Sequence, residues 1–120
     1  MSEQKAVLLR LARDLNEGRA SDVQACFAKD FRLHDPSAPE WPRGHEGARK
    51  MLDAFLAFGS DLTIEICDMV EEDDKIAVRW RAAAKRDGNP VTGSIVAIYR
   101  FVGGLIAEDW GVAVRAPWPE

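Results

Sequence analysis

Apolar residues recur at helical spacing in two stretches of the chain's first half. In residues 2–17 they fall three or four positions apart, which places them on one face of a helix: Leu8, Leu11, Ala12 and Leu15. Ser2 suits the N-cap of this helix, and Gly18 suits its end. The same period returns in residues 45–58, and Gly59 follows it. The pattern therefore predicts two amphipathic helices.

A shorter helix and a proline-rich loop are expected between these two. Ser21 with Gln24 three residues later resembles a capping box, and apolar residues follow at Val23, Cys26 and Phe27. Residues 31–33 read as a short extended piece. Three prolines then fall within residues 34–44, where they cannot supply the N–H groups of a helix or an inner strand. This segment is expected to be a loop.

The second half of the chain alternates β-branched and aromatic runs with turn residues. The runs cover 62–70, 75–85, 91–102 and 105–114, and the joins at 72–74, 87–89 and 103–104 are short enough for hairpins. We expect an α+β fold in which three N-terminal helices pack on a curved antiparallel sheet of about four long strands. Residues 1–120 are expected to form a single domain.

Charge and composition exclude several classes of partner. The formal net charge is -4, and the Lys and Arg residues are scattered, which argues against binding to nucleic acid. The first residues lack the features of a signal peptide, and no apolar run approaches the roughly 20 residues of a membrane span. We therefore expect a cytoplasmic protein with no membrane partner.

Several local strings, in this order and spacing, resemble a known family. They are HDP at 34–36, RGHEG at 43–47, KIAVRW at 75–80, and YRF at 99–101 followed by GG at 103–104 and EDW at 108–110. The chain resembles the SnoaL-like polyketide cyclase family, within the nuclear transport factor 2-like superfamily, over nearly its whole length. The resemblance implies a cone-shaped α+β barrel with an apolar pocket for a small ligand. It also implies a homodimer formed through the outer face of the sheet.

The chain departs from the cyclases of this family at two positions. Those enzymes close a ring by an aldol step, using a strand-borne aspartate as acid and base and a histidine on the preceding strand. The corresponding positions here are Gly111 and Ala97. The usual cyclase mechanism is therefore not expected, and because the family includes isomerases, dehydratases and proteins with no known activity, the fold assigns no reaction.

Strand alternation nominates another acid for the pocket. Ala97, Tyr99 and Phe101 fall on one face of their strand, and Asp109 and Gly111 fall on one face of the next. If these faces line the pocket, Asp109 is desolvated there, and its pKa rises toward a value useful for proton transfer.

Two alternatives to this placement stay open. Asp109 could be solvated or paired with Arg100 or Arg115. The opposite register, with Glu108 and Trp110 pointing inward, is also open because their face of the strand is even more apolar. An outer face buried in a dimer would explain both apolar faces.

Three further residues complete the predicted site. His34 precedes the proline-rich loop, and we expect it at the pocket mouth as a partner base, since imidazole titrates near neutrality. Trp41 lies among the prolines and is the candidate lid, and Trp80 is expected to line the pocket or pack in the core. No metal is expected, because three converging ligands are not evident. No cofactor is expected, because the dinucleotide and phosphate-loop motifs are missing.

Two functional hypotheses follow from the sequence. In the first, the protein is a cofactor-independent enzyme of isomerase, dehydratase or cyclase type, and Asp109 moves a proton on a small, mostly apolar carbonyl compound. In the second, it is a dimeric protein that binds an apolar ligand, or serves as a scaffold, without catalysis. Small side chains at Ala97 and Gly111 would leave room for a ligand in either case.

Overall fold

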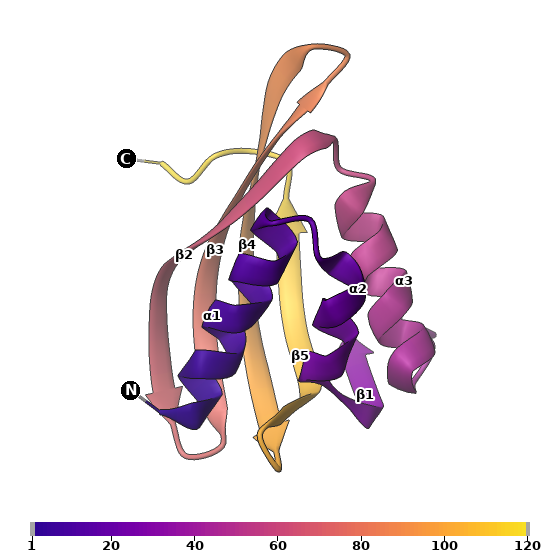
Figure 1. Cartoon of the computed structure of the whole chain (residues 1–120), viewed down its shortest axis with the longest axis vertical. Coiled ribbons are helices and arrows are strands. Elements are labelled where there is room, and N and C mark those ends of the chain that lie inside the picture. The colour runs from indigo at the N-terminus through magenta and orange to yellow at the C-terminus, as the bar shows by residue number, and fades with distance from the viewer. Residues whose placement is uncertain (1, 120) are drawn as a thin grey trace.

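The computed structural model describes residues 2–119 and shows helices on one face of a curved sheet (Figure 1). The helices are α1 (Glu3–Asn16), α2 (Ala20–Val23), the 3-10 turn η1 (Gln24–Cys26) and α3 (Gly44–Leu56). The strands are β1 (Phe27–His34), β2 (Ser60–Glu72), β3 (Lys75–Arg86), β4 (Asn89–Val102) and β5 (Leu105–Val114). The predicted α+β architecture is confirmed.

The sheet has five strands in the order β1-β5-β4-β3-β2 and stays open at both edges. Neighbours from β2 to β5 pair antiparallel, as predicted, but β1 pairs parallel with β5. The four long antiparallel strands are as expected, and β1 adds a fifth, parallel strand at one edge, so the sheet is mixed. Phe27 and Phe31 lie four residues apart, a spacing that also fits a helix, and only pairing with the distant β5 makes this segment a strand.

The long helices α1 and α3 begin close to their predicted positions. The Ser2 side chain accepts a hydrogen bond from the backbone N–H of Lys5 at 3.0 Å, so the predicted N-cap of α1 is confirmed. α3 ends at Leu56, two residues earlier than expected. Its first residue, Gly44, has a φ of 71°, and a Cβ there would lie 2.6 Å from the carbonyl oxygen of Lys29. Only glycine allows α3 to start this close to β1.

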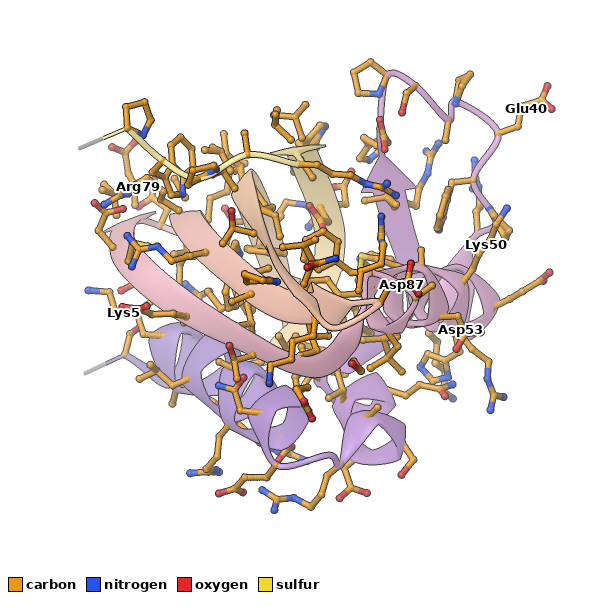
Figure 2. All side chains as sticks on the ribbon, turned by 90° about the horizontal axis from the view of Figure 1, so that it is seen from above. Lys5, Glu40, Lys50, Asp53, Arg79 and Asp87 are labelled. Atoms are coloured by element: carbon orange, nitrogen blue, oxygen red, sulfur yellow. The ribbon has the colours of Figure 1, made fainter. Side chains whose placement is uncertain are left out.

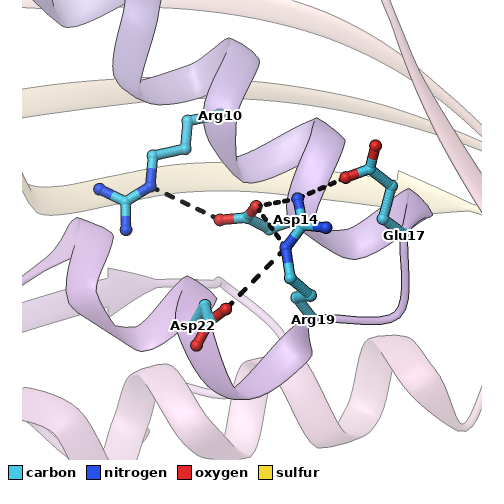
Figure 3. Close-up of polar contacts among 5 residues, drawn as sticks. All are labelled: Arg10, Asp14, Glu17, Arg19 and Asp22. Atoms are coloured by element: carbon cyan, nitrogen blue, oxygen red, sulfur yellow. Dashed lines mark hydrogen bonds and ion pairs between the residues drawn. The ribbon is translucent and has the colours of Figure 1, made fainter.

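The short helix α2 is tied to α1 by ion pairs (Figure 3). Its N-cap is Arg19 rather than Ser21, and no side chain caps it, so the predicted capping box is wrong. The Arg19 guanidinium instead lies 2.8 Å from the carboxylate of Asp14 and also contacts Glu17. This hydrogen bond lowers the pKa of the buried Asp14 carboxyl. The cluster holds the turn between the two helices.

Tight turns and a continuous core complete the domain. Both residues of the turns Asp87-Gly88 and Gly103-Gly104 have positive φ, the conformation that suits two-residue hairpins. The hairpin of β3 and β4 extends beyond the helices (Figure 1). The largest fully buried side chains are Trp80, Phe27, Phe31, Leu8, Ile76 and Ile106. Across residues 2–119, every helix is too short or too polar to cross a membrane.

Candidate functional site

A cavity of about 390 Å³ lies between the sheet and the helices α1 and α3. Its wall is largely apolar and includes Leu11, Leu15, Met51, Leu52, Phe55, Phe58, Ile64 and Ile95. Of the residues proposed from the sequence, Ala97, Tyr99, Gly111, Trp41, Trp80 and Asp109 line it. Phe101 does not: it is 3% exposed and packs in the core beside the cavity. A volume of this size is typical of small-molecule sites.

Asp109 is the polar centre of this cavity. It lies on β5 directly opposite Tyr99 of β4, and it is 5% exposed. Its Oδ1 atom is fully buried and has no hydrogen-bond partner among the described residues. Burial, with a smaller contribution from the negative charge of Asp35, raises the pKa of Asp109 to about 7. This carboxyl can therefore gain or lose a proton near neutral pH.

Gly111 makes room for the carboxylate of Asp109. A Cβ built at Gly111 would lie 3.0 Å from Asp109 Oδ1 and 3.3 Å from the Cβ of Ala97. The Asp109 side chain thus leans along β5 toward the position where the cyclases of the resembled family would carry their aspartate. The carboxylate of Asp109, which comes from the neighbouring inward position on β5, fills the space that the small residues at 97 and 111 leave.

The register places Glu108 and Trp110 on the opposite face of the sheet. Glu108 accepts a hydrogen bond from Arg100 at 2.6 Å and contacts His34 at 2.7 Å, so Arg100 is engaged away from Asp109. These contacts decide against the inward placement of Glu108. The register between β4 and β5 shifts near Ala107, which explains why both Ile106 and Ala107 are buried despite the alternation.

His34 lies outside the cavity, contrary to the expectation that it enters the pocket mouth. It pairs with Trp110 in the β1–β5 register, and the two rings stack with centroids 4.9 Å apart. Its Nε2 lies 2.7 Å from Glu108. Because neighbouring residues of a strand point to opposite faces, the residues of this segment that reach the cavity are Leu33 and Asp35.

Asp35 was missed as a site residue by sequence reasoning. It follows the last residue of β1, and its Oδ1 accepts hydrogen bonds from the backbone N–H and the hydroxyl of Ser37, at 2.9 and 2.7 Å. The signal was present in the alternation of the segment. Once Phe31 and Leu33 are assigned to the inner face, Asp35 follows on the same side and His34 does not.

Tyr99 supplies a second polar group in the wall. Its hydroxyl oxygen accepts a hydrogen bond from Trp80 Nε1 at 2.9 Å. Burial, and then the negative charge of Asp109, raise the pKa of Tyr99 well above its ordinary value. The phenol therefore stays protonated at neutral pH and keeps its own proton available to donate.

Trp41 closes one side of the cavity from the loop after β1. Its Nε1 donates to the carbonyl of Gly47 at 2.9 Å, and the Lys50 ammonium lies 4.6 Å from its ring centroid. A Cβ at Gly47 would meet the Pro42 carbonyl oxygen at 1.9 Å, so the loop approaches α3 too closely for any side chain there. Figure 2 shows Glu40 pointing outward at the tip of this loop.

The described residues do not assemble a metal centre. Over positions 2–119, no three His, Cys, Asp or Glu side chains gather in a way that could hold an ion. The polar groups facing the cavity are instead Asp35, Tyr99, Asp109 and Arg115. This arrangement offers a titratable carboxyl and a neutral hydrogen-bond donor in apolar surroundings, which suits proton transfer.

Solved structures share the fold across nearly the whole chain. A "putative polyketide cyclase" from Acidithiobacillus ferrooxidans is 20% identical with a TM-score of 0.80, and the match covers 95% of this chain and 89% of that one. Wild-type IdmH from Streptomyces antibioticus, also a "putative polyketide cyclase", is 23% identical with a TM-score of 0.77. This match covers 93% of this chain and 92% of that one. An NTF2-like protein of unknown function from Burkholderia pseudomallei is 16% identical with a TM-score of 0.76, over 93% and 91%.

Sequence comparison identifies the family. No curated protein sequence gives a significant match. The SnoaL-like domain matches residues 8–109, which run from Leu8 within α1 to Asp109 and so include most of the cavity wall. The chain therefore belongs to the SnoaL-like domain family.

Proposed function

We propose that the protein is a cofactor-independent enzyme that moves a proton on a small, mostly apolar carbonyl compound. The observation that carries this proposal is the buried Asp109 carboxyl, whose Oδ1 has no partner within residues 2–119 and whose pKa is raised to about 7. An unpartnered carboxylate in an apolar cavity lowers stability, and such groups concentrate at functional sites.

The proposed reaction uses Asp109 and Tyr99 together. The Asp109 carboxylate takes a proton from the carbon next to the carbonyl, and the electron pair of that C–H bond moves into an enolate. Tyr99, directly opposite on β4, donates its hydroxyl proton in a hydrogen bond to the developing oxyanion. The hydrogen bond from Trp80 to the Tyr99 oxygen polarises this donor. If the enolate is conjugated with a C=C bond, return of the proton from Asp109 to another carbon completes an isomerisation. In a cyclisation, the enolate carbon instead attacks a second carbonyl of the same molecule, and the alkoxide that forms takes the proton back from Asp109.

The similarity to proteins named polyketide cyclases supports the reaction class, and the apolar wall supports the ligand class. The usual ring-closing aspartate and histidine positions hold Gly111 and Ala97. In this proposal the acid and base is instead Asp109, whose oxygen reaches toward position 111. Trp41 covers the bound molecule.

Proton exchange on simple ketones tests this proposal, because it reports on acid and base chemistry whatever the natural substrate is. Small cyclic and aromatic ketones are incubated with the protein in D2O, and loss of the signal of the protons next to the carbonyl is followed by NMR. We expect Asp109→Asn to abolish the catalysed exchange. The matched control is Glu108→Gln, which removes a carboxylate from the adjacent position on the other face and should exchange at the wild-type rate. Equal exchange by the wild type and Asp109→Asn would overturn the proposal.

A second candidate function is non-catalytic binding of an apolar ligand. It is favoured by the largely apolar wall of the cavity, in which Ala97 and Gly111 add no reactive groups. In that case the same ketones bind, as detected by quenching of tryptophan fluorescence, but their protons do not exchange. Binding without exchange by the wild-type protein distinguishes this function from catalysis.

We also propose that the protein is a cytoplasmic homodimer formed through the outer face of the sheet. The helices cover only the inner face (Figure 1), and the outer face exposes an apolar patch made of Val96, Ile98, Trp110 and Val112. Ile98 lies directly opposite Trp110, and Val96 opposite Val112, so the patch is continuous across two strands. Contiguous exposed apolar surface of this kind marks interaction sites.

A further inference from the structure

A second carboxylate, that of Asp35, lines the cavity but has no role in the proposed reaction. Asp35 lies at the cavity wall, just beyond β1, and is half-buried. Its neighbour His34 faces the other side of the sheet, so Asp35 is the charged residue that this segment contributes to the wall.

Geometry brings Asp35 close to Asp109. Leu33 lies beside Asp109 in the parallel pairing of β1 with β5, and both strands continue in the same direction. Two residues further on, Asp35 therefore approaches the level of Gly111. The carboxylate of Asp109 leans toward that same level, because its Oδ1 lies 3.0 Å from the Cβ position of Gly111. The register and the cavity lining thus place both acidic side chains on the inner face of the sheet, near the level of Gly111.

The surroundings of the two carboxyl groups differ. Asp35 Oδ1 accepts two hydrogen bonds from Ser37, which hold its carboxylate in place. Asp109 Oδ1 accepts none from residues 2–119 and is fully buried. A negative charge near a buried carboxyl disfavours ionisation of that carboxyl.

We infer that Asp35 is a positioning residue of the same site: its carboxylate, held by Ser37, adds a negative charge that, together with burial, favours the protonated form of Asp109. Asp35 touches no reacting atom in this arrangement and acts through Asp109. It moves to higher pH the range over which Asp109 switches between acid and base. The inference rests on the proposed function for its purpose, although the coupling between the two carboxyl groups exists with or without catalysis.

The other charged and titratable groups facing Asp109 are accounted for. Tyr99 on β4 stays neutral, as its raised pKa requires. Arg115 follows β5 and lines the cavity, but it is an exposed side chain and forms no ion pair with Asp109 within the described chain. The side chains that α1 and α3 bring to the wall, within residues 2–119, are apolar. Asp35 is therefore the negative charge that acts on Asp109.

Site-resolved titration of Asp109 by carbon-13 NMR tests the inference. In Asp35→Asn the amide oxygen can still accept from Ser37, so the loop keeps its geometry while the charge is lost. We expect the titration midpoint of Asp109 to fall by roughly one pH unit. The pH profile of ketone exchange should shift by the same amount in the same direction.

Two control variants separate a charge effect from a structural one. Asp30→Asn removes an exposed carboxylate from β1 outside the cavity and should leave the midpoint unchanged. Ser37→Ala loosens the loop but keeps the Asp35 charge. The titration midpoint of Asp109 should therefore stay higher in Ser37→Ala than in Asp35→Asn. If Asp35→Asn does not fold, Asp35→Ser replaces it in the same comparison.

The outcomes distinguish this inference from the proposed function. A lowered midpoint supports the role of Asp35 even if no ketone exchanges, in which case only the proposed reaction fails. An unchanged midpoint in the folded Asp35 variant overturns the inference, whether or not exchange occurs. An equal fall in Ser37→Ala and Asp35→Asn would also overturn it, because loop geometry rather than charge would then be the cause.

Discussion

At the scale of single residues, the ionisation of Asp109 opposes folding. Its pKa is about 7 in the folded protein and about 3.8 when the chain is unfolded, so the folded state binds the proton more tightly. The resulting stability is fully present below the unfolded pKa and is lost as the pH rises through the folded value. A shift of this size corresponds to about 4 kcal/mol. A buried group that lowers stability in this way is a candidate for a functional role at the site.

Asp109→Asn should therefore stabilise the protein in a pH-dependent way. We expect the variant and the wild type to differ little near about pH 4, where the folded forms of both carry a neutral side chain. The variant should gain stability progressively as the pH rises to about 8, by up to about 4 kcal/mol in the free energy of unfolding. Urea unfolding followed by circular dichroism at several pH values measures this difference. A difference that does not vary with pH would mean that Asp109 is not a buried, ionising carboxyl.

At the scale of elements, the pleat of β5 decides where the carboxylate lies. Asp109 and Gly111 are successive inward positions, and the Asp109 side chain occupies space that any residue larger than glycine would take at 111. Its direction along the strand therefore depends on Gly111 and on the small Ala97 opposite.

Gly111→Ala should disturb the site more than the fold. Its methyl group would lie 3.0 Å from Asp109 Oδ1, so the carboxylate must move by a few tenths of an ångström or more. Misplacement of a catalytic group by about 1 Å can cost about a hundredfold in rate, and we expect at least a tenfold slower ketone exchange. Alanine is otherwise better suited than glycine to a strand, so thermal unfolding should be little changed. Unaltered exchange in the folded variant would show that the placement of Asp109 does not depend on position 111.

The elements also show which parts of the fold the sequence could predict. α1, α3 and β2 to β5 follow from local signals: helical periodicity, alternation, and turns that favour positive φ. β1 could not be predicted in full, because its apolar residues fit a helix and its partner β5 is more than seventy residues away. The candidate site was likewise predictable from the sequence only in part. Alternation indicated the side of β5 on which Asp109 lies, but His34 was placed on the wrong side of β1, and Asp35 was overlooked for that reason.

At the scale of the whole molecule, the two faces of the sheet differ in what they carry. The inner face, under the helices, carries the core and the cavity, and the outer face carries the apolar patch of Val96, Ile98, Trp110 and Val112. His34, Glu108 and Arg100 form a linked polar group beside that patch. The contact between His34 and Trp110 therefore belongs to the proposed subunit interface rather than to the proposed active site.

Sedimentation velocity tests the proposed dimer. We expect the wild-type protein to sediment as a dimer at micromolar concentration. Ile98→Lys, which places a charge in the centre of the patch beside Trp110, should give a monomer. The control is Leu9→Lys, a similarly exposed position on α1, which should remain dimeric. A wild-type monomer, or equal behaviour of the two lysine variants, would contradict the assignment of this face.

Titration of the Asp109 carboxyl in the wild-type protein, followed by carbon-13 NMR and assigned with Asp109→Asn, is the most direct test of the proposed site. We expect a midpoint at about 7, because the carboxyl is buried, its Oδ1 has no hydrogen-bond partner among residues 2–119, and the charge of Asp35 adds to the effect of burial. A midpoint near the ordinary aspartate value of about 4 would mean that the group is solvated or paired in solution, and it would remove the basis for acid and base chemistry at this site.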